Sequence, residues 1–176
     1  MVQTARKPAA DIESQLLPEP FAGWFATRGW TPREHQLRLL AEVDAGNSAL
    51  LIAPTGGGKT LAGFLPALIE LNEGRHRPAN GIHTLYVSPL KALAVDVARN
   101  LMQPVEEMGL DVKVETRTGD TPASRKQRQR YAPPDILMTT PEQVALLLSH
   151  PDARTLLGGL RFLVIDEIHS LATSKR

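Results

Sequence analysis

Apolar residues recur every three or four positions in four segments of the chain. This spacing predicts helices, because 3.6 residues per turn bring such positions onto one face. The four segments are 21–28, 33–44, 59–72 and 94–108. We interpret the last of them as a long crossover helix with a single apolar stripe.

Short apolar runs bounded by turn residues form a second pattern, which predicts buried strands. The runs are 49–52, 83–88, 112–116, 136–139 and 162–165. Because these strands alternate with the helices, the sequence predicts an α/β fold in three layers, with a parallel sheet between helices. Ligands of such sheets bind beyond the carboxyl ends of the strands, so the loops that follow the strands are the candidate functional sites.

Composition narrows the class of protein. The 176 residues are 42% hydrophobic with a formal net charge of +1, which predicts a folded globular protein and not a disordered one. No apolar run approaches the ~20 residues that span a bilayer, so we expect no membrane partner. The lack of cysteine excludes disulfides and thiolate zinc sites in this sequence and makes the cytoplasm the default compartment. Residues 1–20 are small and polar and are predicted to form a flexible leader.

The loop after the first predicted strand, 53–60 (APTGGGKT), follows the phosphate-loop pattern. Its three glycines let backbone N–H groups surround an anion, and the following helix adds the partial positive charge of its N-terminus. We expect Lys59 to reach the β- and γ-phosphates and the Thr60 hydroxyl to bind Mg²⁺. The predicted nucleotide-binding residues of this loop are Thr55, Gly56, Gly57, Gly58, Lys59 and Thr60.

A second motif, which is acidic, follows the last predicted strand: residues 166–169 are DEIH. We expect Asp166 to hold Mg²⁺, directly or through water, and Glu167 to polarise the attacking water, since phosphoryl transfer depends on positioning and charge stabilisation. The sequence carries no Asn-Lys-x-Asp guanine reader. ATP is therefore the favoured nucleotide, and Lys59, Asp166 and Glu167 are the predicted catalytic residues.

Together with further motifs, these residues resemble a superfamily 2 DExH-box helicase from about residue 21 to residue 176. Segment 29–36 (GWTPREHQ) resembles the Q-motif, 88–93 (SPLKAL) motif Ia, 118–120 (TGD) the threonine-glycine-aspartate motif and 139–142 (TTPE) motif Ib. The resemblance implies that Gln36 reads the adenine edge and that His169 couples nucleotide state to motif III. The nucleic-acid contacts that it implies are Pro89, Lys91, Thr118, Gly119, Thr140 and Pro141.

The amino-acid sequences of these motifs are similar, more narrowly, to those of the Lhr (large helicase-related) group, and within it to those of ligase-associated DNA DEXH-box helicases. This likeness implies that 21–176 is a first RecA-like, P-loop NTPase domain that is truncated after the DEIH box. It also implies an ATP-driven 3′–5′ helicase or translocase in DNA repair. Its implied partners are single-stranded or partly duplex DNA, a second RecA-like domain of its own chain, and a DNA ligase and nuclease.

In this family a Ser-Ala-Thr motif III and a second RecA-like domain with arginine fingers follow the DEIH box. We therefore expect the sequence to be the N-terminal fragment of a longer motor that lacks a central strand of its sheet. Arginine fingers contribute about 10³ to 10⁵ in rate, so this chain alone is expected to hydrolyse ATP weakly and not to unwind DNA. The alternative is a non-catalytic module that binds nucleic acid in response to nucleotide.

Overall fold

The computed structural model describes residues 17–54 and 56–172. The chain divides into two compact units, Met1–Ile69 and Glu70–Arg176. Helices α2 (Phe21–Thr27) and α3 (Glu34–Asp44) belong to the first unit, and α4 (Lys59–Asn72) contains the boundary. These bounds confirm the three helices predicted from the apolar spacing, to within one residue at each end.

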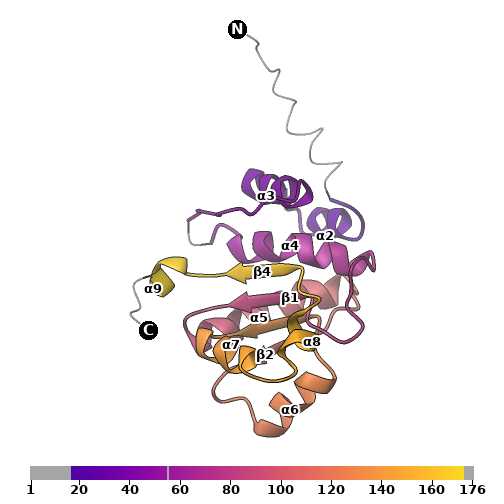
Figure 1. Cartoon of the computed structure of the whole chain (residues 1–176). Coiled ribbons are helices and arrows are strands. Elements are labelled where there is room, and N and C mark those ends of the chain that lie inside the picture. Colours follow the sequence, from indigo (N-terminus) through magenta and orange to yellow (C-terminus); the bar gives the residue numbers. More distant parts are fainter. Residues whose placement is uncertain (1–16, 55, 173–176) are drawn as a thin grey trace. The chain divides into compact units, whose positions relative to one another are not determined.

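The second unit is built on a four-stranded parallel sheet, shown in Figure 1. Its strands are β1 (Thr84–Val87), β2 (Val114–Arg117), β3 (Ile136–Thr139) and β4 (Phe162–Ile165), in the order β2-β3-β1-β4. Val87 pairs with both Thr139 and Ile165, so the carboxyl ends of three strands are level. The loops that follow them therefore leave the sheet at one edge, as the sequence predicts.

Helices flank this sheet (Figure 1). They are α5 (Lys91–Glu107), α6 (Ala123–Tyr131), α7 (Pro141–Leu148) and α8 (Ala153–Leu157), while the short helix α9 (Ile168–Ala172) follows the end of β4. Leu147 of α7 and Leu156 of α8 share a buried core with Leu85 and Leu137 of the sheet, while α5 packs against β2 and β3. The predicted α/β class is thus confirmed. No helix in the described ranges has the length and apolar character needed to cross a membrane.

The predicted strand at 49–52 is wrong. The structure assigns no strand there, and Leu50 and Ile52 are 71% and 85% exposed. An apolar run becomes a strand only where its backbone N–H and C=O groups pair with a neighbouring strand. Among the described residues, the sheet consists of β1 to β4 alone, and 49–52 pairs with none of them.

The predicted leader falls largely outside the described residues, which begin at Leu17. Leu17 itself is buried, with 6% of its surface exposed. The carbonyl oxygen of Pro18 accepts a hydrogen bond from the backbone N–H of Phe21 at 3.0 Å. The last residues of segment 1–20 therefore take part in starting α2.

Candidate nucleotide site and nucleic-acid interface

The glycine loop runs directly into α4, and its backbone needs glycine at three positions. Gly56 and Gly58 have φ angles of +76° and +72°, in the left-handed region that side chains disfavour. Gly57 has an ordinary φ, but a Cβ there would lie 2.8 Å from the carbonyl oxygen of Pro54. Thr55 lies outside the described residues. The loop is therefore a cradle that only side-chain-free residues can form in this conformation.

Lys59 is the first residue of α4, a 14-residue helix. Its Nζ donates a hydrogen bond to the carbonyl oxygen of Ala53 at 2.7 Å, so the side chain folds back along the loop. An ammonium group has three donors, which leaves two for another acceptor. Thr60 follows on the same first turn, and both side chains are half-buried. The free N–H groups and the dipole of a helix N-terminus favour anions at this position.

Gln36 of α3 lies against the same loop and is 3% exposed. Its Oε1 accepts a hydrogen bond from the backbone N–H of Arg33 at 2.8 Å, which forms part of a capping box at the start of α3. Its Nε2 donates to the carbonyl oxygen of Gly58 at 3.4 Å. The amide keeps one donor and one acceptor position beyond these two contacts.

The donor set of this unit fits the triphosphate of a nucleotide. A glycine cradle, an ammonium group and the N-terminus of a long helix meet at one loop, and each favours phosphate oxygens. The Thr60 hydroxyl is an oxygen ligand of the kind that Mg²⁺ prefers.

The acidic pair lies in the second unit, directly after β4. The backbone N–H of Asp166 donates to the carbonyl oxygen of Val87 at 3.0 Å, which holds Asp166 beside the end of β1. Its Oδ2 accepts a hydrogen bond from the Tyr86 hydroxyl at 2.6 Å, and its Oδ1 accepts one from the backbone N–H of Glu167 at 2.9 Å. Each carboxylate oxygen still has a lone pair, so the half-buried Asp166 fits an Mg²⁺ ligand or an acceptor of metal-bound water.

Glu167 has a φ of +49°, which is uncommon for a residue with a side chain. Its Oε2 lies 3.3 Å from Nδ1 of His169, and both side chains are largely exposed. Strained backbone of this kind clusters at functional sites. The positive φ therefore supports a functional role for Glu167, and the structure also brings its side chain beside His169.

Sequence reasoning missed Tyr86, which lies in the middle of the apolar strand β1 and is 2% exposed. Burial and the neighbouring Asp166 carboxylate raise the pKa of this phenol well above its usual value, so it keeps its proton at neutral pH and donates a hydrogen bond. A tyrosine in a buried strand indicates that its hydroxyl needs a hydrogen-bond partner inside the protein. The partner could not be named from the sequence, because 80 positions separate the two residues.

The residues expected to contact nucleic acid lie at the carboxyl edge of the sheet. Lys91 begins α5, and its Nζ lies 2.9 and 3.0 Å from the two carboxylate oxygens of Asp120. This ion pair joins motif Ia to the loop that contains Gly119. Thr118 and Thr140 are only 5% and 4% exposed, so their hydroxyls are mostly covered.

Two more of these residues are prolines. Pro89 follows β1, and Pro141 occupies the first turn of α7, where Thr140 is the N-cap. The structure therefore brings all six predicted contacts to one edge of one sheet. Lys91 and Gly119 are the exposed members of this set, and Pro89 and Pro141 are half-buried.

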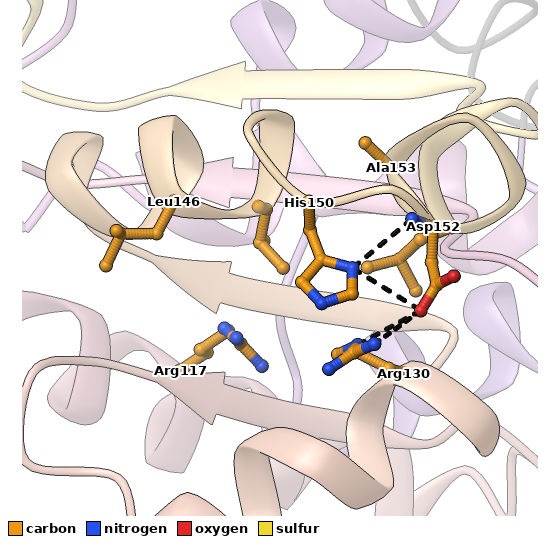
Figure 2. Close-up of a pocket in the computed structure, with 8 residues that line it drawn as sticks. Arg117, Arg130, Leu146, His150, Asp152 and Ala153 are labelled. Atoms are coloured by element: carbon orange, nitrogen blue, oxygen red, sulfur yellow. Dashed lines mark hydrogen bonds and ion pairs between the residues drawn. The ribbon is translucent and has the colours of Figure 1, made fainter.

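The cavity in Figure 2 lies in the second unit, and Arg117, the last residue of β2, is one of its lining residues. Asp152 lines the cavity, and its Oδ2 lies 2.5 Å from Nη2 of Arg130 and 3.4 Å from Nδ1 of His150. Arg117 lines it and is 8% exposed; burial and the charge of Arg130 lower the pKa of its guanidinium. The cavity holds about 20 Å³, which is room for one water molecule. It is too small for a nucleotide or a base.

These sites match a known family. The model of the DEAD/DEAH box helicase family matches residues 33–176, which include both the glycine loop and the DEIH box. The chain belongs to the DEAD/DEAH box helicases.

Two curated relatives of this helicase chain are Lhr proteins. It is 43% identical over 163 residues to the Lhr helicase/probable uracil glycosylase of Mycolicibacterium smegmatis, which covers 87% of this chain and 11% of the relative. It is 38% identical over 188 residues to the ATP-dependent helicase Lhr-Core of Methanocaldococcus jannaschii, covering 99% of this chain and 22% of the relative. The chain thus spans about a tenth to a fifth of these relatives' lengths.

A solved structure gives the same result for the fold. The Mycobacterium smegmatis helicase Lhr, bound to ssDNA and AMP-PNP, superimposes with a TM-score of 0.76 and 41% identity. The match covers 88% of this chain and 20% of that one. The predicted RecA-like α/β fold is therefore confirmed, as are the helicase family and the likeness to the Lhr group.

Proposed function

We propose that residues 21–176 form the first RecA-like, ATP-binding domain of an ATP-dependent 3′–5′ DNA helicase or translocase. The observation that carries this proposal is Lys59 at the start of α4, directly after three glycines whose conformation disfavours side chains, in a DEAD/DEAH box helicase chain. The Lhr structure that this chain resembles holds both AMP-PNP and ssDNA. We infer the same two ligand classes, a nucleoside triphosphate and a DNA strand, for this helicase.

In this proposal each predicted residue has one role. Lys59 and the loop N–H groups bind the phosphates, and Gln36 holds the loop through Gly58 and presents its remaining amide positions to the base. Thr60 and Asp166 are the oxygen ligands for Mg²⁺, which neutralises phosphate charge when it is bound. Glu167 orients the attacking water and accepts its proton, and His169 transmits the state of the nucleotide.

The DNA strand is proposed to follow the carboxyl edge of the sheet. Lys91 and the backbone N–H groups at the starts of α5 and α7 suit phosphate oxygens, which position a strand without reading its sequence. The second RecA-like domain is proposed to lie in the same native chain, and the ligase-associated branch, with a DNA ligase and nuclease as repair partners, is the proposed subgroup. The cytoplasm remains the predicted compartment and rests on the cysteine-free composition.

ATP turnover by the longest natural gene product that contains this chain tests the proposal. We expect turnover that single-stranded DNA stimulates, and we expect Lys59→Ala to reduce it at least about 100-fold through lost phosphate binding and charge stabilisation. Lys113→Ala is the matched control, because Lys113 is a half-exposed lysine that pairs with Glu115 in the second unit.

Two outcomes would contradict this proposal. Turnover that persists in Lys59→Ala would mean that the glycine loop is not the phosphate site. Tight nucleotide binding with no turnover in the unmodified protein, with or without DNA, would support the non-catalytic binding module. The intact mass of the natural product is a separate check, and a mass several-fold above 19.2 kDa is expected for a two-domain motor.

A further inference from the structure

Tyr86 and Asp166 form a contact that neither the family motifs nor the proposed roles account for. The Tyr86 hydroxyl donates to Oδ2 of Asp166 at 2.6 Å, a distance typical of a hydrogen bond from a hydroxyl to a carboxylate. Tyr86 is almost fully buried in β1, and Asp166 is tied to the same strand through the carbonyl oxygen of Val87. Both groups lie in the second unit: Tyr86 is in β1, and Asp166 directly follows β4, the parallel strand that pairs with β1.

The geometry restricts the rotation of the Asp166 carboxylate. Oδ2 is held by Tyr86 and Oδ1 by the backbone N–H of Glu167, so neither oxygen can turn without losing a hydrogen bond. A tyrosine hydroxyl is a neutral donor, so it orients the carboxylate without itself adding a positive charge beside it. An arginine or lysine in this place would neutralise the charge that a divalent cation needs.

We propose that Tyr86 is a positioning residue that orients the Asp166 carboxylate for Mg²⁺ bound with the nucleotide. This inference rests on the proposed function, because it takes Asp166 as the metal-binding carboxylate. Partners in the outer shell of a metal site fix the direction of its ligands, and their removal weakens metal binding about 10- to 100-fold. Tyr86 would act in this way from β1, the strand that leads into the SPLKAL segment at the start of α5.

The test replaces the hydroxyl alone. Tyr86→Phe keeps the buried ring and removes the donor, and Tyr131→Phe is the matched control because Tyr131 is a 68% exposed tyrosine on α6. The affinity for a fluorescent ADP is measured in the longest natural gene product, once with Mg²⁺ and once with a chelator. We expect Tyr86→Phe to reduce the strengthening by Mg²⁺ about tenfold and to leave the metal-free affinity unchanged.

A second measurement separates positioning from packing. The Mg²⁺ concentration for half-maximal ATP turnover should rise about tenfold in Tyr86→Phe, with turnover near that of the unmodified protein at saturating Mg²⁺. In Asp166→Asn, adding Tyr86→Phe should change the Mg²⁺ effect no further, because the hydroxyl acts through Asp166.

Three results would overturn the inference. These are an unchanged Mg²⁺ effect in Tyr86→Phe, a stronger one, or an equal loss of affinity with and without Mg²⁺, which is the signature of a merely structural role. Failure of the proposed function is distinguishable from these, since it appears in Lys59→Ala as retained nucleotide binding and turnover. That variant leaves Tyr86 and Asp166 untouched.

Discussion

Gln36 and Gly58 lie in contact across 22 positions of sequence, with Nε2 of the glutamine 3.4 Å from the glycine carbonyl oxygen. A Cβ on Gly58 would lie 2.9 Å from that same Nε2. The capping-box glutamine of α3 and the glycine loop are therefore packed against each other. A change in either residue is transmitted directly to the other.

Gly58→Ala should weaken nucleotide binding by more than about tenfold. The new methyl group meets Gln36, and the φ of +72° adds strain of about 1–2 kcal/mol. Gly74→Ala is the control, because Gly74 has a φ of +68° with no atom within 4 Å of its Cβ position. It should lose similar stability and keep its nucleotide affinity, as measured by ADP titration and thermal unfolding. Equal affinity in the two variants would mean that the cradle adapts.

Glu167→Gln should separate binding from chemistry. The amide keeps the size of the side chain but cannot accept a proton, so ATP turnover should fall about 10²- to 10⁴-fold. Nucleotide affinity should change by less than about threefold, since phosphate binding is assigned to the loop and Lys59. Glu106→Gln, on the exposed side of α5, is the control. Loss of binding together with turnover would show that Glu167 has a structural role.

Lys91→Ala should weaken binding of single-stranded DNA of any sequence. One lost phosphate contact lowers the slope of log affinity against log salt concentration by about 1. Fluorescence anisotropy at several salt concentrations measures this slope, and Lys113→Ala provides the control at a position away from the SPLKAL loop. An unchanged slope would mean that Lys91 contacts no phosphate and that its ion pair with Asp120 only links the start of α5 to the loop after β2.

The buried His83 should make stability depend on pH. Its Nε2 lies 3.3 Å from Oε1 of Glu70, which also contacts Nε of Arg161 at 3.0 Å. Burial lowers the pKa of His83 below its usual 6.5, although Glu70 and Asp135 act in the opposite direction. The unfolded chain therefore binds this proton more readily than the folded chain.

This difference in proton binding means that the free energy of unfolding falls as the pH falls. The stabilisation by His83 is complete above pH 6.5, and it is lost as the pH falls from there towards the lowered pKa of the folded state. Urea unfolding at pH 7.5 and pH 5.5 should show a smaller free energy of unfolding at the lower pH. His83→Gln should reduce this difference, whereas His169→Gln, at a 76% exposed side chain, should not. A pH effect of the same size in His83→Gln would exclude His83 as its source.

Local patterns were enough to predict most of the elements. The bounds of α4, β3 and β4 match the predicted segments. Burial agrees with the apolar runs in α4 and β3, whereas β4 alternates between half-buried and exposed positions, with Leu163 56% and Ile165 43% exposed. Segment 49–52 has the same apolar composition, yet it is exposed and forms no strand. Propensity belongs to the segment, while a strand also needs backbone partners from distant parts of the chain.

The sequence by itself determined the chemistry available to this helicase. Glycines followed by lysine and threonine specify an anion cradle, and the carboxylates after β4 supply oxygen ligands, because those properties belong to the residues themselves. Only the tertiary structure decided which groups meet. Tyr86 reaches Asp166 across 80 positions, and Gln36 meets Gly58 across 22, since strand order and helix packing set these distances. Hydrogen bonds act over about 3 Å, so no local pattern contains them.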